Sequence, residues 1–467
     1  MRKTGKIFGL IFLVIVLFCT FSYGSLPLDK SEYAARRAKL MKMIPDGAAI
    51  IFGAQSQIGY REFYQNNDFV YLSGVEIPNS ILIVDGIKKE SVLFFTITER
   101  AARNEGIELD VVRNPKDVTG VEKVLPVEQF SNYLATLSSQ VKVFYTFFNP
   151  EELIRESSSS KFTTLTRNMT LNEWDGRLTR ELQFVKLLKE RYPRVQVRDC
   201  SELIWDLRTI KSPAEIEVIR KAARIAVKGY TEMMKATRVG MHEYELAALF
   251  KYFCEKEGAQ DLSYYVIISS GENHPYVHYY KHDRVLKDGD FIVVDCGPEI
   301  GYYTVDISIS YPANGKFTAR QREIYEAALA LHKANINFYK AGMTLTELTK
   351  RVNETLTQKG FDLSKDIFKM ETMRPWFGHY VGMAVHDVGV RPGGNPEGPL
   401  KPGMVFANEP YAVFPNENLG VRIEDTILVT ENGCENLTAG IPREINEIES
   451  LMKKEGVVQL LKKSGFY

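Results

Sequence analysis

Short apolar runs of strand length mark the first third of the chain. They cover residues 48–52, 80–84, 91–95 and 141–147, with helical spacing and turn residues between them. Such alternation is typical of α/β proteins. It predicts an α/β domain within residues 25–200, with a further helix over residues 174–191.

The next part of the chain begins with a strong helix signal. Ser212 supplies a capping hydroxyl, Pro213 stands where its missing N–H costs nothing, and Glu215 completes a capping box. One apolar face follows, formed by Ile216, Ile219, Ala223, Val227 and Tyr230. A second helix is predicted over residues 242–256, with Gly258 at its end. These signals open a second domain, residues 206–467.

Landmarks of the second helix occur twice in this domain. A glycine before the helix, a glutamate near its start and a glycine after it each recur 102 residues later, in the pairs Gly240 and Gly342, Glu245 and Glu347, and Gly258 and Gly360. The repetition predicts an internal duplication of a unit of helices and strands. The alternative is a chance match of two helix caps.

Composition narrows the class of protein. The chain has 467 residues, 45% hydrophobic and 25% charged, which suits a folded protein of two or more domains. Lysine plus arginine equals aspartate plus glutamate, at 59 each. No global charge attracts a nucleic acid or an anionic membrane, so neither is an expected partner.

The first 24 residues differ from the rest of the chain. Arg2, Lys3 and Lys6 precede the apolar run 7–21, which predicts a signal peptide over residues 1–24 and a periplasmic or extracellular protein. A retained membrane anchor is disfavoured, because about 15 apolar residues fall short of the roughly 20 that a spanning helix needs. A lipoprotein modified at Cys19 is disfavoured because Phe18 is bulky where a lipobox requires a small residue.

The other cysteines are scattered, without the spacings of a zinc knuckle or a redox dithiol. They are expected to be buried free thiols, although export leaves a disulfide open. They are Cys200, Cys254, Cys296 and Cys434.

Two aspartates stand out in a predicted hairpin. Residues 291–294 form an apolar strand that ends in Asp295, residues 297–301 form a turn, and residues 302–311 alternate with Asp306 on the polar face. A hairpin of this length can bring the two carboxylates together. Adjacent like charges are costly unless a proton or a metal ion neutralises them. Alone, the pair could equally be a strand end and a solvent-facing aspartate.

Other polar groups embedded in apolar sequence favour a metal site over the alternative of two unrelated aspartates. Glu409 lies near the end of the apolar run 406–410, which closes with Asn408-Glu409-Pro410, and Arg422 and Glu424 share one face of an alternating strand. His379 and His386 lie within one short Gly-rich apolar segment, in a chain that has 7 histidines. Four carboxylates and an imidazole form a hard ligand set, suited to two divalent ions of the manganese, cobalt or zinc kind. Such paired ions commonly activate water for hydrolysis.

The local sequences around these residues resemble, in order, the motifs of the pita-bread metallopeptidases, a family that includes aminopeptidase P (Xaa-Pro aminopeptidase), prolidase and methionine aminopeptidase. The motifs are Val294-Asp295-Cys296-Gly297, Tyr303-Thr304-Val305-Asp306-Ile307, Gly378-His379, Val385-His386-Asp387-Val388-Gly389, Pro402-Gly403-Met404-Val405, Asn408-Glu409-Pro410 and Arg422-Ile423-Glu424-Asp425. Residues 64–74 resemble the accessory domain of aminopeptidase P. The resemblance implies an α/β accessory domain followed by an α+β pita-bread catalytic domain, whose pseudo-twofold symmetry accounts for the repeat.

The resemblance also implies roles for individual residues. Asp295 is expected to bind the first ion, His379 and Glu409 the second, and Asp306 and Glu424 both. Glu409 is also expected to accept a proton during catalysis. His278 and His386 match the family's catalytic and substrate-binding histidines, and Arg422 is a further substrate-binding candidate. A surface role is the alternative for His278.

Three positions depart from the proline-specific members of the family. Pro375 stands where they carry a histidine, Val413 where they carry a tyrosine, and Ile309 where an arginine is common. The expected function is therefore a secreted dinuclear-metal aminopeptidase that acts on peptides, with proline preference left open. The alternatives are a prolidase-like Xaa-Pro dipeptidase and a catalytically silent binding protein. A homo-oligomer is also left open.

Overall fold

The computed structural model describes residues 28–56, 59, 62–155, 161–389 and 398–465. The predicted signal peptide and Cys19 lie outside these ranges. Among the helices in the described ranges, none combines the length and apolar character needed to cross a membrane.

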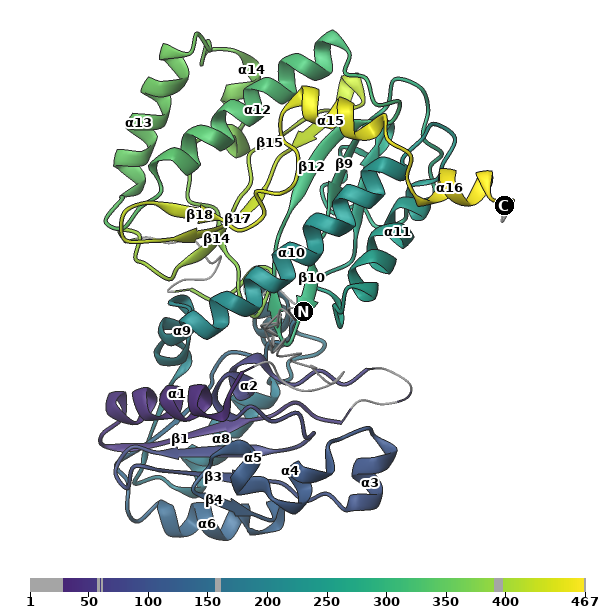
Figure 1. The fold of residues 1–467 in the computed structure, drawn as a ribbon. Helices are drawn as coiled ribbons and strands as arrows, with labels where there is room; N and C mark the ends of the chain where they lie inside the picture. The colour runs from purple at the N-terminus through teal and green to yellow at the C-terminus, as the bar shows by residue number, and fades with distance from the viewer. Residues whose placement is uncertain (1–27, 57–58, 60–61, 156–160, 390–397, 466–467) are drawn as a thin grey trace, which may run out of the picture.

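A six-stranded sheet forms the centre of the N-terminal domain, which lies at the bottom of Figure 1. In spatial order its strands are β4 (Lys123–Leu125), β3 (Glu90–Phe94), β2 (Ile81–Asp85), β1 (Gly47–Phe52), β5 (Val143–Thr146) and β6 (Gln196–Asp199). The structure confirms the four predicted strands. The edge strands β4 and β6 were not predicted, because their exposed positions carry polar residues such as Lys123 and Arg198.

Helices cover both faces of this sheet. Ile51 of β1 belongs to the same core as Leu40 of α1 (Lys30–Met43), whereas Ile50 belongs to a second core with Leu134 of α6 (Phe130–Leu137). The strands are apolar along their length because both faces are buried. The remaining α-helices of this domain are α2 (Asn67–Ser73), α3 (Glu99–Asn104), α4 (Leu109–Arg113), α5 (Pro115–Thr119) and α8 (Arg180–Arg191).

The helix predicted over residues 174–191 is shorter than expected. It begins at Arg180 as α8, where the Thr179 hydroxyl accepts a hydrogen bond from the Leu182 N–H. Gly176 precedes it with a φ of 55°, which a continuous helix excludes. Trp174 is 91% exposed, so its side chain does not contribute to an apolar helix face.

In Figure 1, α9 (Ser201–Thr209) lies between the two domains. It falls where the domain boundary was predicted, and the exact division of the chain stays a prediction. The following α10 (Pro213–Ala236) has the predicted capping box between Ser212 and Glu215. The other helices of the C-terminal domain are α11 (Glu243–Lys256), α12 (Ala319–Phe338), α13 (Leu345–Gln358), α14 (Asp366–Lys369), α15 (Ile445–Met452) and α16 (Val457–Lys463).

The C-terminal domain has the predicted repeat. Helices α11 and α13 occupy equivalent places in it, and each is followed by a glycine with positive φ, 96° at Gly258 and 84° at Gly360. A three-stranded sheet accompanies the first pair of helices, in the order β12 (Ser308–Pro312), β9 (Phe291–Asp295) and β8 (Ile267–Ser270). A four-stranded sheet accompanies the second pair, in the order β13 (His379–Tyr380), β14 (Val405–Asn408), β17 (Asp425–Val429) and β18 (Cys434–Asn436).

Two small sheets complete this domain and correct one prediction. They contain β11 (Tyr303–Thr304), β10 (Pro298–Ile300) and β7 (Asp261–Leu262), and β15 (Tyr411–Phe414) and β16 (Leu419–Arg422). Residues 302–311 were predicted as one strand, but they divide into β11 and β12. The separate hairpin of β10 and β11 turns through Gly301 and Tyr302, whose φ values are 52° and 69°.

Each of the four described cysteines is a free thiol, as expected. Cys200, Cys254 and Cys296 are buried, and Cys434 is partly buried.

Candidate metal centre

Asp295 and Asp306 lie side by side at the end of the first sheet. Strands β9 and β12 are antiparallel with Ser308 opposite Asp295, so Asp306 emerges just before β12 beside the first aspartate. The Tyr264 hydroxyl lies 2.5 Å from Asp295 Oδ1 and 2.6 Å from Asp306 Oδ1 and donates to this pair. The predicted hairpin geometry is therefore confirmed for the two carboxylates, each of which is buried.

Glu424 joins this pair from the second sheet. It lies between β16 and β17, where an isolated bridge connects it to Ser308. The Ser308 hydroxyl donates to Glu424 Oε2 at 2.7 Å, and the Asp306 N–H donates to the Thr426 hydroxyl at 2.9 Å. The two halves of the repeat thus meet at their carboxylates.

Glu409 and His379 come from neighbouring strands of the second sheet. Glu409 directly follows β14, whose last residue pairs with the first residue of β17. His379 begins β13 and pairs with Ala407 of β14. A Cβ at Gly378 would lie 1.6 Å from the Ala407 carbonyl oxygen, so glycine is required where the chain enters this strand. Sheet pairing therefore positions both predicted ligands.

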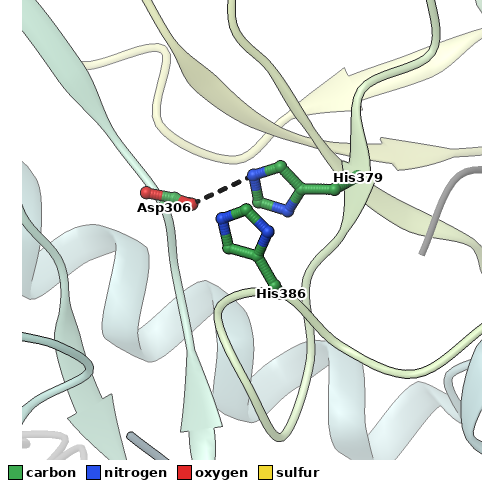
Figure 2. A group of neighbouring side chains, drawn as sticks. All are labelled: Asp306, His379 and His386. Atoms are coloured by element: carbon green, nitrogen blue, oxygen red, sulfur yellow. Dashed lines mark ion pairs between the residues drawn. The ribbon is translucent and has the colours of Figure 1, made fainter. Parts of the chain in front are cut away.

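The His379 side chain points into the carboxylate cluster. Its Nε2 lies 3.4 Å from Asp306 Oδ2 and 4.0 Å from Glu424 Oε1. The His386 ring stacks on it, with 3.8 Å between ring centroids and 8° between ring planes. Figure 2 shows both rings directed toward Asp306 from a segment that lies opposite its strand.

Potential ligand atoms converge in overlapping groups. One group is Asp295, Asp306 and Glu424, and another is His379, Glu409 and Glu424, with the atoms of each group within 4.8 Å of one another. A third group combines Asp306 and His379 with His386. The structure therefore brings together all five residues that were predicted as ligands.

These residues fit a divalent cation. Burial, together with the charges of Asp295 and Glu409, raises the pKa of Asp306, while burial and the charge of Asp306 raise the pKa of Glu424. Burial also raises the pKa of Glu409 to about 7. Glu424 Oε1 is buried without a hydrogen-bond partner among the described residues. Converging buried carboxylates with an unsatisfied oxygen are stabilised by a bound cation.

Arg422 lies at the edge of this cluster. Its Nη1 is 2.5 Å from Asp295 Oδ2, its Nε is 3.5 Å from Glu409 Oε1, and its Nη2 donates to the Val277 carbonyl at 3.1 Å. The guanidinium therefore balances part of the carboxylate charge. Its role in substrate binding stays a prediction.

The two predicted catalytic histidines lie in different environments. His386 is partly buried, and the charge of His379, burial and the charge of His278 lower its pKa to about 2. His278 is exposed and directly follows Val277, whose carbonyl contacts Arg422. The structure thus places His278 at the rim of the centre.

Sequence reasoning missed several supporting residues. Tyr264 contacts two predicted ligands, but it lies about 30 residues before the nearer one, and only its place just before β8 could have indicated this contact. Asp425, directly after Glu424, is buried among four partners: His332, Asn436, Thr438 and Arg443. These contacts hold the ligand-bearing strand in place.

Comparisons with known proteins agree with this geometry. Metallopeptidase family M24 matches residues 217–431, and the N-terminal domain of aminopeptidase P matches residues 33–145. The Xaa-Pro aminopeptidase of Escherichia coli is 31% identical, and the alignment covers 91% of this chain and 98% of that protein. Xaa-Pro aminopeptidase 3 of Rattus norvegicus is 30% identical, with 91% of this chain and 87% of that protein covered.

Solved structures support the same relationship. The structure of E. coli aminopeptidase P with the inhibitor Pro-Leu superimposes with a TM-score of 0.73 at 30% identity, covering 91% of this chain and 98% of that one. The fold and the centre define a metallopeptidase with a pita-bread catalytic domain. The chain belongs to metallopeptidase family M24 and combines its catalytic domain with an aminopeptidase P N-terminal domain. It is a metal-dependent peptidase.

Proposed function

We propose that this peptidase is an exported Xaa-Pro aminopeptidase with two divalent ions, manganese being the first candidate and cobalt or zinc the others. The observation that carries the proposal is the pair of ligand groups that overlap at Glu424. Each group suits one ion. The two groups can share Glu424 because its carboxylate has two oxygens, one for each ion. The substrate class is supported by the names of relatives that match the chain over most of their length.

The proposed division of the ligands between the ions follows the resemblance to the pita-bread metallopeptidases. Asp295 would hold the first ion, His379 and Glu409 the second, and Asp306 and Glu424 both. When bound, such ions polarise the scissile carbonyl and activate water for attack. The hard oxygen-rich set favours manganese over ions that prefer thiolates.

The protein's own side chains complete the chemistry. Glu409 is placed to accept the proton of the attacking water, since its carboxylate is partly exposed beside the buried ligands. His386 is placed to support the carbonyl of the peptide bond and the tetrahedral intermediate, because its ring lies against His379. His278 at the rim is placed to contact the peptide as it enters. Arg422 holds Asp295 and can contact substrate only from its edge.

Proline preference must come from a pocket that differs from the family pattern. Pro375 and Val413 are partly exposed, so neither side chain is enclosed in the core. Ile309 is fully buried within β12 and belongs to the core. We expect an apolar pocket for the proline ring rather than one with a histidine and a tyrosine. The N-terminal domain is proposed to restrict access to short or unfolded peptides.

Substrate length and proline content test this function. The manganese-loaded protein is expected to release the first residue of Ala-Pro-Ala with a kcat/KM at least about tenfold higher than for Ala-Ala-Ala, because an apolar pocket discriminates by that order. Free amino acids and dipeptides would be separated by liquid chromatography. Cleavage of Ala-Pro without cleavage of Ala-Pro-Ala would replace this assignment with a dipeptidase, and no cleavage of either peptide would indicate a silent protein.

Export is proposed from the first 24 residues, whose basic start and apolar run have the order of a signal peptide. The protein isolated from its natural source is expected to begin near Ser25. Mass spectrometry of its N-terminal peptide tests this, and a mature chain that begins at Met1 would contradict it.

A further inference from the structure

A buried group of charged residues connects the two domains. Arg208 of α9 donates from Nη1 to Asp68 Oδ1 at 2.8 Å, and from Nη2 to Glu152 Oε1 at 2.7 Å and to Asp387 Oδ1 at 2.5 Å. Lys211 Nζ contacts the other oxygen of Asp387 at 3.1 Å. Their side chains are at most 6% exposed, so solvent does not screen these charges. Asp68 and Glu152 belong to the N-terminal domain, whereas Asp387 belongs to the catalytic domain.

The same contacts hold a segment of the metal centre. Asp387 directly follows His386, and the Asp387 N–H donates to the Tyr380 carbonyl at 2.9 Å. From the N-terminal domain, Asn67 Nδ2 donates to the Met383 carbonyl at 3.2 Å and to Glu152 Oε1 at 2.9 Å. The turn between His379 and His386 is therefore held both at its middle and at its end.

This arrangement explains the conspicuous sequence of residues 64–74 in the N-terminal domain. These residues form no strand of the domain's sheet and supply no predicted metal ligand. Asn67 and Asp68 begin α2, and both are buried against the other domain rather than exposed to solvent. An unpaired buried charge is strongly unfavourable, so each carboxylate fixes where the Arg208 guanidinium lies. The guanidinium in turn fixes Asp387.

We propose that Asn67 and Asp68 are positioning residues for catalysis, which hold the His386 ring against His379 through Arg208 and Asp387. The catalytic centre then depends on both domains, and the N-terminal domain orients a catalytic side chain in addition to restricting access. The inference rests on the proposed function, since it requires His386 to act on the peptide bond.

Asp68→Asn is the most direct perturbation. Asp68 Oδ1 accepts from Arg208, and Oδ2 accepts from Trp205 Nε1 at 3.4 Å. An asparagine of the same shape must turn its NH₂ group toward one of these two donors. The substitution therefore disturbs the orientation of Arg208 with little change in side-chain volume.

The test is a double-mutant cycle with His386→Ala, measured on the full-length metal-loaded protein with Ala-Pro-Ala. Asp68→Asn is expected to lower kcat at least about tenfold, because small misplacements of a catalytic group cost that much or more, while KM stays within about twofold. In the His386→Ala background, Asp68→Asn is expected to change kcat by less than about twofold, since coupled residues are not additive.

Glu76→Gln is the matched control. Glu76 is a partly buried carboxylate of the N-terminal domain, and it accepts a hydrogen bond from Tyr302 of the catalytic domain at 2.9 Å. It is not among the described residues that contact Arg208 or Asp387. It is expected to keep the kcat of the wild type. Circular dichroism and the thermal midpoint would verify the fold of every variant, and Asn67→Ala, a milder change, replaces Asp68→Asn if that variant does not fold.

The outcomes separate the inference from the function. Equal losses of kcat with and without His386 would overturn the inference, because a purely structural effect does not depend on that ring. An unchanged kcat in Asp68→Asn and Asn67→Ala would also overturn it. Failure of the wild type to cleave the peptide would contradict the proposed function itself, and an unaffected His386→Ala variant would contradict the catalytic role of that histidine and the inference with it.

Discussion

Asp306→Asn is expected to abolish measurable peptidase activity, with kcat/KM reduced by more than about 100-fold. Loss of a residue that only supports a metal ligand costs about 10–100-fold, and Asp306 is itself proposed to bind both ions. Its carboxylate lies 3.4 Å from His379 and shares the Tyr264 hydroxyl with Asp295. A neutral amide in this place cannot balance the charge of two cations.

The control variant for Asp306→Asn changes an aspartate outside the metal centre. Asp366→Asn serves, because the Asp366 side chain is 89% exposed and its ion pair among the described residues is with Lys369 on the surface of α14. Its activity on Ala-Pro-Ala is expected to equal that of the wild type. An Asp306→Asn variant with more than about a tenth of the wild-type kcat/KM would contradict the assignment of Asp306 as a shared ligand.

Removal of the metal ions is expected to destabilise the protein by about 4 kcal/mol for each ion, relative to ions present at about 1,000 times their dissociation constant. The native state alone brings the five ligands together, so binding favours folding. Without metal the site keeps buried carboxylic acids whose pKa is raised, to about 7 for Glu409. An acid whose pKa rises on folding binds its proton more tightly in the native state. The metal-free protein should therefore lose stability as the pH rises from about 4.5 through about 7.

Urea denaturation with chelator and with manganese, at several pH values between about 5 and 8, measures both effects. The stability loss at rising pH should be smaller with manganese, because the ions hold the carboxylates in their charged form. Asp306→Asn serves as control, since manganese should stabilise it less. Identical unfolding curves with chelator and with manganese would show that no ion binds this site.

The sequence indicates the metal ligands well because local pattern determines where they lie. Asp295 ends an apolar strand, and a short connection returns the chain so that Asp306 lies beside it. Glu424 shares a strand face with Arg422, and the structure directs both side chains to the same cluster. Strand periodicity therefore identifies these residues as candidates, whereas their roles as ligands follow from the family resemblance.

Contacts between distant segments could not be predicted in this way. Arg443 donates to the backbone carbonyls of Ser308 and Glu424, and no periodicity relates the three positions. Arg208 likewise reaches Asp68 and Glu152 only when the two domains pack together. The edge strand β6 was missed because its exposed polar side chains interrupt the apolar pattern. The start of α8 was placed too early because Gly176, whose φ is positive, ends the helical spacing before it.

The central claim is that five side chains hold two divalent ions, and metal content tests it most directly. The wild-type protein would be dialysed against manganese, freed of excess ion and analysed by elemental mass spectrometry, beside Asp306→Asn. The account predicts about two manganese ions for each wild-type chain and fewer than about one for the variant. A wild-type protein that retains no divalent ion would contradict it.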